Sequence, residues 1–128
     1  MQKGERKMEN TKTEKNLAER TRTFALRIIK MYSALSRSTV AQVLGKQVLR
    51  SGTAIGANYR EANRGRSRAE FVAKMGDCLK ELDETAYWLE LLVEAEIVSS
   101  ERLAPLQDET NQLIAIFVTI LKRTKEKI

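Results

Sequence analysis

Apolar residues recur every three or four positions along most of the chain, and this spacing places them on one face of a helix. Four segments show it: residues 16–35, 40–63, 67–96 and about 106–124. No strand pattern competes with them. Because short connections between long helices favour antiparallel neighbours, the sequence predicts an all-α, up-down-up-down four-helix bundle.

Start and stop signals support these segments. Ser67 and Glu70 have the spacing of a capping box before the third helix. The start of the fourth helix stays open between a cap at Ser99 or Ser100 and Pro105 at the first helical position. The core-facing positions expected in the second helix are Val40, Leu44, Val48, Ser51, Ile55, Asn58 and Ala62.

At 128 residues the chain is long enough for one domain with a real core. We assign residues 16–128 to the bundle and expect the polar residues 1–15 to be disordered or frayed. The lone Cys78 forms no internal disulfide, and no signal peptide is evident. The longest apolar run, residues 113–121, is far below the ~20 residues that span a bilayer. A cytoplasmic protein without membrane contact is therefore expected.

The net charge of +6 is unevenly placed, with basic residues around 50–68 and acidic ones in 69–97. One interpretation is that the two regions neutralise each other within the fold or between subunits. The other is a basic surface that attracts nucleic acid. Arginine pairs well with phosphate, and four arginines cluster at the turn between the second and third helices. The candidate nucleic-acid contacts are Arg50, Arg60, Arg64, Arg66 and Arg68.

Two helices have apolar surface beyond one core stripe. On the third helix, Glu84, Tyr87, Trp88 and Leu91 form one outward patch at helical spacing. Such a patch usually marks a contact, although the aromatic pair is also compatible with an edge of the bundle. On the second helix, Gly52, Gly56 and Tyr59 flank the stripe, and the glycines make room for a neighbouring helix, expected to come from another subunit. These seven residues are the candidate interface of a homo-oligomer.

Polar residues of the second and third helices favour a structural network. Asn58 falls in the expected core stripe, where an unpaired amide costs about 1–3 kcal/mol, so it needs hydrogen-bond partners. A basic helix beside an acidic one indicates salt bridges across the bundle or between subunits. The expected network comprises Arg50, Asn58, Glu61, Lys80 and Glu81.

The sequence gives little support for a catalytic site or a cofactor-binding site. The chain has no histidine, which excludes histidine-ligated metal and haem sites and nucleophiles activated by histidine. Cys78 beside the core stripe is better explained as a buried, inert thiol. Glu81 and Glu84 are better explained by a solvated or ion-paired face than by an acid–base pair. We therefore expect no enzyme, no metal and no cofactor.

The stretches QVLRSGTAIGANYREA and SRAEFVAKMGDCLKELDETAYWLELL closely resemble the four-helix bundle protein family first found encoded within intervening sequences of 23S ribosomal RNA genes. Ala54 departs from the serine of the family pattern. The resemblance implies a left-handed bundle that assembles into a ring-shaped homopentamer. Related accessory proteins of diversity-generating retroelements bind a reverse transcriptase and nucleic acid, so both kinds of partner are implied here.

From these observations we expect a non-catalytic, homo-oligomeric bundle whose basic surface binds RNA or DNA non-specifically, as an accessory to a larger enzyme. The alternative is a protein-interaction scaffold with no nucleic-acid role, in which the uneven charge serves only assembly. An enzyme would require an activity that depends on Glu81, Glu84 or Cys78.

Overall fold

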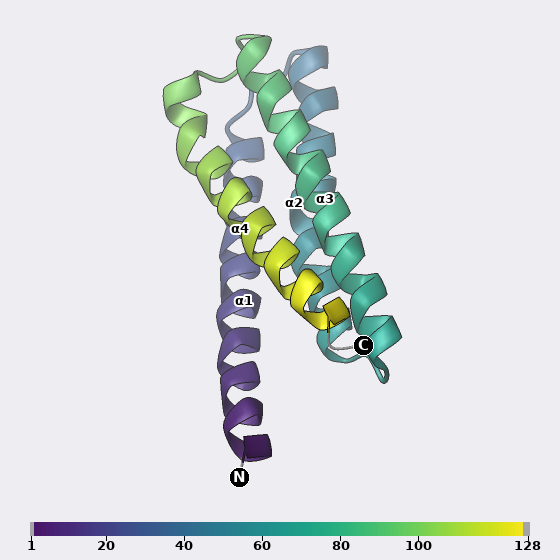
Figure 1. Cartoon of the computed structure of the whole chain (residues 1–128). Coiled ribbons are helices and arrows are strands. Elements are labelled where there is room, and N and C mark those ends of the chain that lie inside the picture. The colour runs from purple at the N-terminus through teal and green to yellow at the C-terminus, as the bar shows by residue number, and fades with distance from the viewer. Residues whose placement is uncertain (1, 127–128) are drawn as a thin grey trace.

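The computed structural model describes the backbone of residues 2–126 and the side chains of residues 15–126. It contains α1 (Gln2–Ser33), α2 (Thr39–Asn63), α3 (Arg68–Glu94) and α4 (Ser100–Glu126), with no strand in the described range. Consecutive helices run in opposite directions (Figure 1). The contact between α2 and α3 is the most extensive and that between α1 and α4 the least. The predicted all-α, up-down-up-down four-helix bundle is confirmed.

The first 15 residues were expected to be disordered or frayed. The backbone of residues 2–15 forms the first turns of α1, which extend beyond the ends of the other helices (Figure 1). Side chains of residues 1–14 lie outside the described part of the chain. The expected fraying or disorder of residues 1–15 therefore stays a prediction.

Serine side chains cap three helix starts. The Ala41 amide donates to Ser38 Oγ at 3.3 Å, and the Glu70 amide donates to Ser67 Oγ at 3.1 Å. At α4 the Arg102 amide donates to Ser99 Oγ at 3.3 Å, so Ser99 is the cap. Pro105 lies inside α4 instead of starting it. Each cap satisfies an amide that has no partner within its own helix.

The core stripe of α2 is rotated relative to the predicted one. Val48, Ser51, Ile55 and Ala62 are buried as expected, but Val40 is 57% exposed and Asn58 is only partly buried. Tyr59 takes the core position, with its ring edge-on to Phe117 at 5.7 Å between centroids. An aromatic ring gains more from burial than an amide does, which explains the rotation.

Glycines of α2 let α1 of the same chain approach closely. A Cβ atom added at Gly52 would lie 2.9 Å from Ile28 Cγ1, and one at Gly56 would lie 3.3 Å from Thr21 Oγ1. Gly45, which the sequence analysis did not single out, faces α1 in the same way. The neighbouring helix expected from another subunit is therefore α1 itself, which corrects that interpretation.

This packing predicts opposite effects for two glycine-to-alanine variants. Gly52→Ala forces a methyl group against the fully buried Ile28 and is expected to cost about 1–3 kcal/mol of stability. Gly76→Ala in α3 meets nothing within 4 Å and is expected to gain about 0.5–1 kcal/mol, because alanine favours the helix. Urea unfolding measures both. Equal stability of the two variants would contradict the close α1–α2 contact.

Candidate nucleic-acid interface

Four arginines surround the turn between α2 and α3. Arg60 lies in the last turn of α2, Arg64 at its C-cap and Arg66 in the turn, while Arg68 begins α3; all four are exposed. We call them the arginine rim. The structure thus brings together these four predicted residues at one end of the bundle.

Hydrogen bonds hold the backbone of this turn. The Gly65 amide donates to the Ala62 carbonyl at 3.2 Å, and the Arg66 amide donates to Glu70 Oε2 at 2.7 Å. The Glu70 carboxylate thus reaches back across the turn, much as the capping box predicted, but to Arg66 instead of Ser67. The side chains of the rim therefore project from a fixed backbone.

Few carboxylates compete for the rim. Glu61, the nearest acidic residue in α2, forms an ion pair with Lys74 Nζ at 2.6 Å. Among the side chains that the structure describes, Arg60, Arg64 and Arg66 have no carboxylate within ion-pair distance. Their charges are thus available to an external anion.

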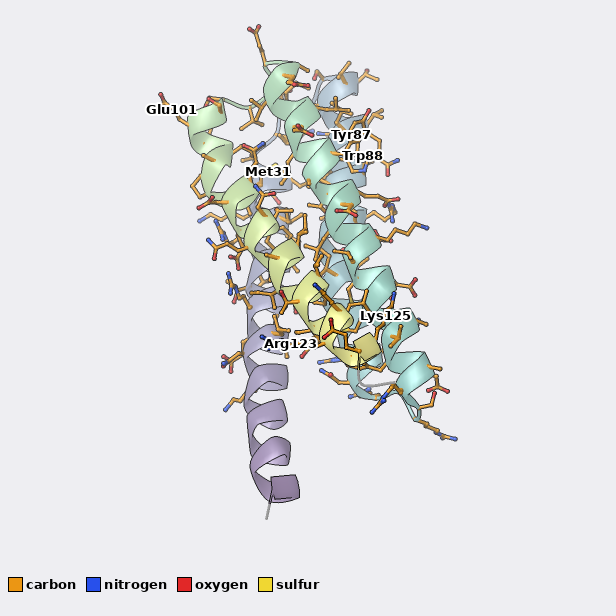
Figure 2. All side chains as sticks on the ribbon, in the orientation of Figure 1. Met31, Tyr87, Trp88, Glu101, Arg123 and Lys125 are labelled. Atoms are coloured by element: carbon orange, nitrogen blue, oxygen red, sulfur yellow. The ribbon has the colours of Figure 1, made fainter. Side chains whose placement is uncertain are left out.

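The structure adds cations that the sequence analysis did not connect with the rim. α4 ends at the same end of the bundle as the α2–α3 turn, and its last turn carries Arg123 and Lys125 (Figure 2). A groove of about 830 Å³ between α1 and α2 is lined by Arg22 as well as Arg60 and Arg64. The sequence could have indicated this placement, because it predicts an up-down topology and carries a basic run near residue 123.

Arg50 lies apart from the rim, within a cluster between α2 and α3. Its guanidinium pairs with Glu84 Oε2 at 2.6 Å and with Glu81 Oε2 at 3.2 Å. The hydrogen bond from Arg50 holds the pKa of the Glu84 carboxyl below its usual range. Arg50 is therefore occupied by two carboxylates, and the geometry favours its predicted structural role over its predicted role as a nucleic-acid contact.

The rest of the predicted network is not assembled. Glu61 pairs with Lys74, and no hydrogen bond or ion pair of Asn58 or Lys80 occurs among the described side chains. Asn58 lies at the edge of the core, where its amide does not need a protein partner. A buried hydrogen bond from Thr85 Oγ1 to Ser51 Oγ, 2.8 Å long, links α2 and α3 instead. The sequence signal for this bond was a hydroxyl residue at a core position of each helix, Ser51 in α2 and Thr85 in α3, and it was missed.

The seven predicted interface residues fall into two groups. Gly52, Gly56 and Tyr59 are used in packing within the chain, so their assignment to a contact between copies is corrected. Glu84, Tyr87, Trp88 and Leu91 lie on the outer side of α3. Tyr87 is 53% exposed, and its ring stands edge-on to the partly buried Trp88. For these four, a contact between copies stays a prediction.

Cys78 has the environment of a structural thiol. It is fully buried, and its Sγ donates to the Ile55 carbonyl at 3.6 Å. Burial raises the pKa of this thiol to about 12, so the reactive thiolate is scarce at neutral pH. Groups of three or more His, Cys, Asp or Glu side chains placed to hold a metal ion do not occur among the described residues.

The fold and these surfaces define a small helical bundle with a basic end. Residues 13–119 match the model of the 23S rRNA-intervening sequence protein family, and the chain belongs to that family. It is 38% identical to a protein of unknown function from the S23 ribosomal protein family of Bacteroides thetaiotaomicron, whose crystal structure superposes with a TM-score of 0.80. That match covers 85% of this chain and 97% of the other. No significant match is found among curated proteins.

Within the described residues, each helix is too short or too polar to cross a membrane.

Proposed function

We propose that the protein is a non-catalytic, self-associating bundle that binds the phosphate backbone of RNA or DNA through its basic end. The observation that carries this proposal is the arginine rim, with Arg123 and Lys125 at the same end of the molecule. Guanidinium groups match phosphate oxygens in geometry and stay charged at any relevant pH.

The composition of the basic end favours binding without sequence selectivity. Tyr87 and Trp88, the ring pair of α3, lie towards the other end of that helix (Figure 2). Tyr59 points into the core. The rim therefore offers charge without exposed rings on which bases stack, which favours backbone contacts over base recognition.

The salt dependence of binding tests this proposal. The logarithm of the affinity for a generic RNA duplex is expected to fall linearly with the logarithm of the salt concentration, because each phosphate contact releases bound counterions. With four or more contacts, affinity should drop about 100-fold or more between 50 and 200 mM salt. Fluorescence anisotropy measures it. Absence of binding at 50 mM salt, or affinity that salt leaves unchanged, would contradict phosphate contacts.

An apolar patch on the outer side of α2 and α3 supports self-association. The Ser51–Thr85 and Arg50–Glu84 bonds set the antiparallel register of the two helices. Continuing that register by two turns brings the start of α2 beside the residues around Leu91 in α3. Val43, 56% exposed, therefore lies level with Leu91, and Val40, 57% exposed, lies one turn nearer the start of α2. We call Val40, Val43, Tyr87, Trp88 and Leu91 the α2–α3 patch. Apolar clusters of this kind usually mark contacts.

A double lysine variant tests the association. Wild-type protein is expected to sediment as an oligomer at micromolar concentration, and the family resemblance implies five subunits. Val43→Lys with Tyr87→Lys should weaken association at least about tenfold, because both side chains would bury a charge in the contact. The matched control is Leu26→Lys with Val118→Lys, which alters two exposed apolar residues on α1 and α4. A monomeric wild type would contradict the proposal.

The scaffold alternative makes a different prediction. In a scaffold, the basic and acidic regions would pair with each other within the assembly. Arg50 already pairs with Glu81 and Glu84 in this way within one chain. A scaffold would associate but bind no nucleic acid at any salt concentration. A protein partner such as a reverse transcriptase, which the resemblance implies, is compatible with either function.

A further inference from the structure

A second cavity lies at the opposite end of the bundle from the arginine rim. It opens between the end of α1 and the start of α4 and has a volume of about 410 Å³. This volume is in the range of sites that hold small organic molecules. Figure 2 shows Met31 where α1 faces α4, whereas Glu101 projects outward from the start of α4.

About half of the wall of this cavity is apolar. Leu103 and Leu106 are buried, and Met31, Leu35, Ile97 and Val98 are partly buried. The smaller apolar lining residues Ala34 and Pro105 are exposed. A hydrocarbon or ring placed here would remove this surface from water, which stabilises the complex.

Every charged residue that lines the cavity is a cation: Arg27, Lys30 and Arg102. Among the described side chains, none of the three lies within ion-pair distance of a carboxylate. Arg27 is close enough to Glu109 to contribute to the lowered pKa of that carboxyl. Both Glu109 oxygens, however, accept hydrogen bonds from Arg20, at 2.8 and 2.7 Å. The three cations therefore have unused capacity for an anion.

The position of Arg102 opposes local stability. It lies in the first turn of α4, where the helix dipole disfavours a positive charge. A residue that conflicts with its local structure is a sign of a functional constraint. An anion held between Arg102 and Arg27 would reduce this conflict, because it would neutralise the positive charge in the first turn of α4.

From these observations we propose that the cavity binds a small amphiphilic anion, a molecule with a carboxylate or phosphate headgroup on an apolar body. The headgroup pairs with Arg27, Lys30 and Arg102, and the apolar body lies against Met31 and Leu103. The site is separate from the α2–α3 patch and from the arginine rim. The inference therefore does not depend on whether the protein binds nucleic acid.

Methionine methyl NMR tests this inference on the full wild-type chain. Decanoate and decyl phosphate serve as probes below their micellar concentrations, with decanol as the uncharged control. The Met31 methyl signal is expected to shift on titration, while that of Met75, fully buried in the core, stays in place. At least one anion should bind at least tenfold more tightly than decanol, and the tighter anion identifies the headgroup. Decanol binding as tightly as both anions, or equal shifts at both methionines, would overturn the proposal.

A charge variant adds an independent test. Arg27→Gln with Arg102→Gln is expected to weaken binding of the preferred anion at least tenfold while leaving that of decanol unchanged. The matched control is Arg37→Gln with Lys46→Gln, which removes two exposed cations that do not line the cavity. Unchanged anion affinity in the first variant, or an equal loss in both, would show that the cavity cations do not hold the headgroup.

Discussion

Replacing Arg60, Arg64, Arg66 and Arg68 together by glutamine is expected to weaken RNA-duplex binding by about 100- to 1,000-fold at 0.1 M salt. Each phosphate contact strengthens binding under these conditions through counterion release. Glutamine keeps a long polar side chain but loses the charge. The slope of log affinity against log salt should also become shallower by about one for each lost contact.

The control for this variant removes the same amount of charge elsewhere. Lys30, Arg37, Lys46 and Arg102 are four exposed cations away from the α2–α3 turn, and their joint replacement by glutamine lowers the net charge equally. Only a small loss of affinity is expected, because long-range attraction is largely screened beyond about 10 Å at 0.1 M salt. Equal losses in the two variants would show that net charge, and not the rim, governs binding.

Phe117→Ala is expected to destabilise the bundle by about 3–5 kcal/mol, the range for removing a buried aromatic ring. Phe117 is fully buried and meets the ring edge of Tyr59, so both burial and an aromatic pair are lost. Domains of this size have only about 5–15 kcal/mol of stability, so the variant should be close to unfolding.

The neighbouring Val118 provides the control, since it is 44% exposed on the outer side of α4. Val118→Ala should change stability by no more than about 0.5 kcal/mol. Urea unfolding followed by circular dichroism measures both variants. If Phe117→Ala costs no more than Val118→Ala, the assigned core between α2 and α4 is wrong.

The helices and their caps were predictable because their causes are local. Apolar spacing placed Leu17, Phe24 and Ile28 in the core, and Ser67 capped its helix as the capping box indicated. The end of α3 was less predictable, because the chain leaves the helix through Glu96 in a left-handed conformation with φ of 59°. Glycine is the usual residue there, so the sequence lacked the ordinary stop signal.

The partners of these helices were harder to predict than the helices themselves. Sequence spacing shows that Gly52 and Gly56 accept a close neighbour, but it does not show which helix this is. Tyr59 and Asn58 are adjacent, and a rotation of one residue exchanges core and edge. The packing of Tyr59 on Phe117, 58 positions along the chain, decides between them.

The basic end was predicted in part. The four residues of the arginine rim fall within residues 60–68, so their clustering needed only the turn between two helices. Arg123 and Lys125 lie at the same end as the arginine rim only because α4 returns to that end of the bundle (Figure 1). Arg50, almost three turns before Arg60 and near the middle of α2, faces two acidic residues of α3 instead, which spacing along one helix does not reveal.

Photo-crosslinking of the wild-type protein to 4-thiouridine-labelled RNA, with the crosslinked peptides mapped by mass spectrometry, locates the binding surface directly. Crosslinks are expected in peptides that contain residues 60–68 and 123–125, at one end of the bundle. Crosslinks confined to the other end, around residues 34–46 and 94–102, would contradict the placement of the nucleic-acid contact at the arginine rim.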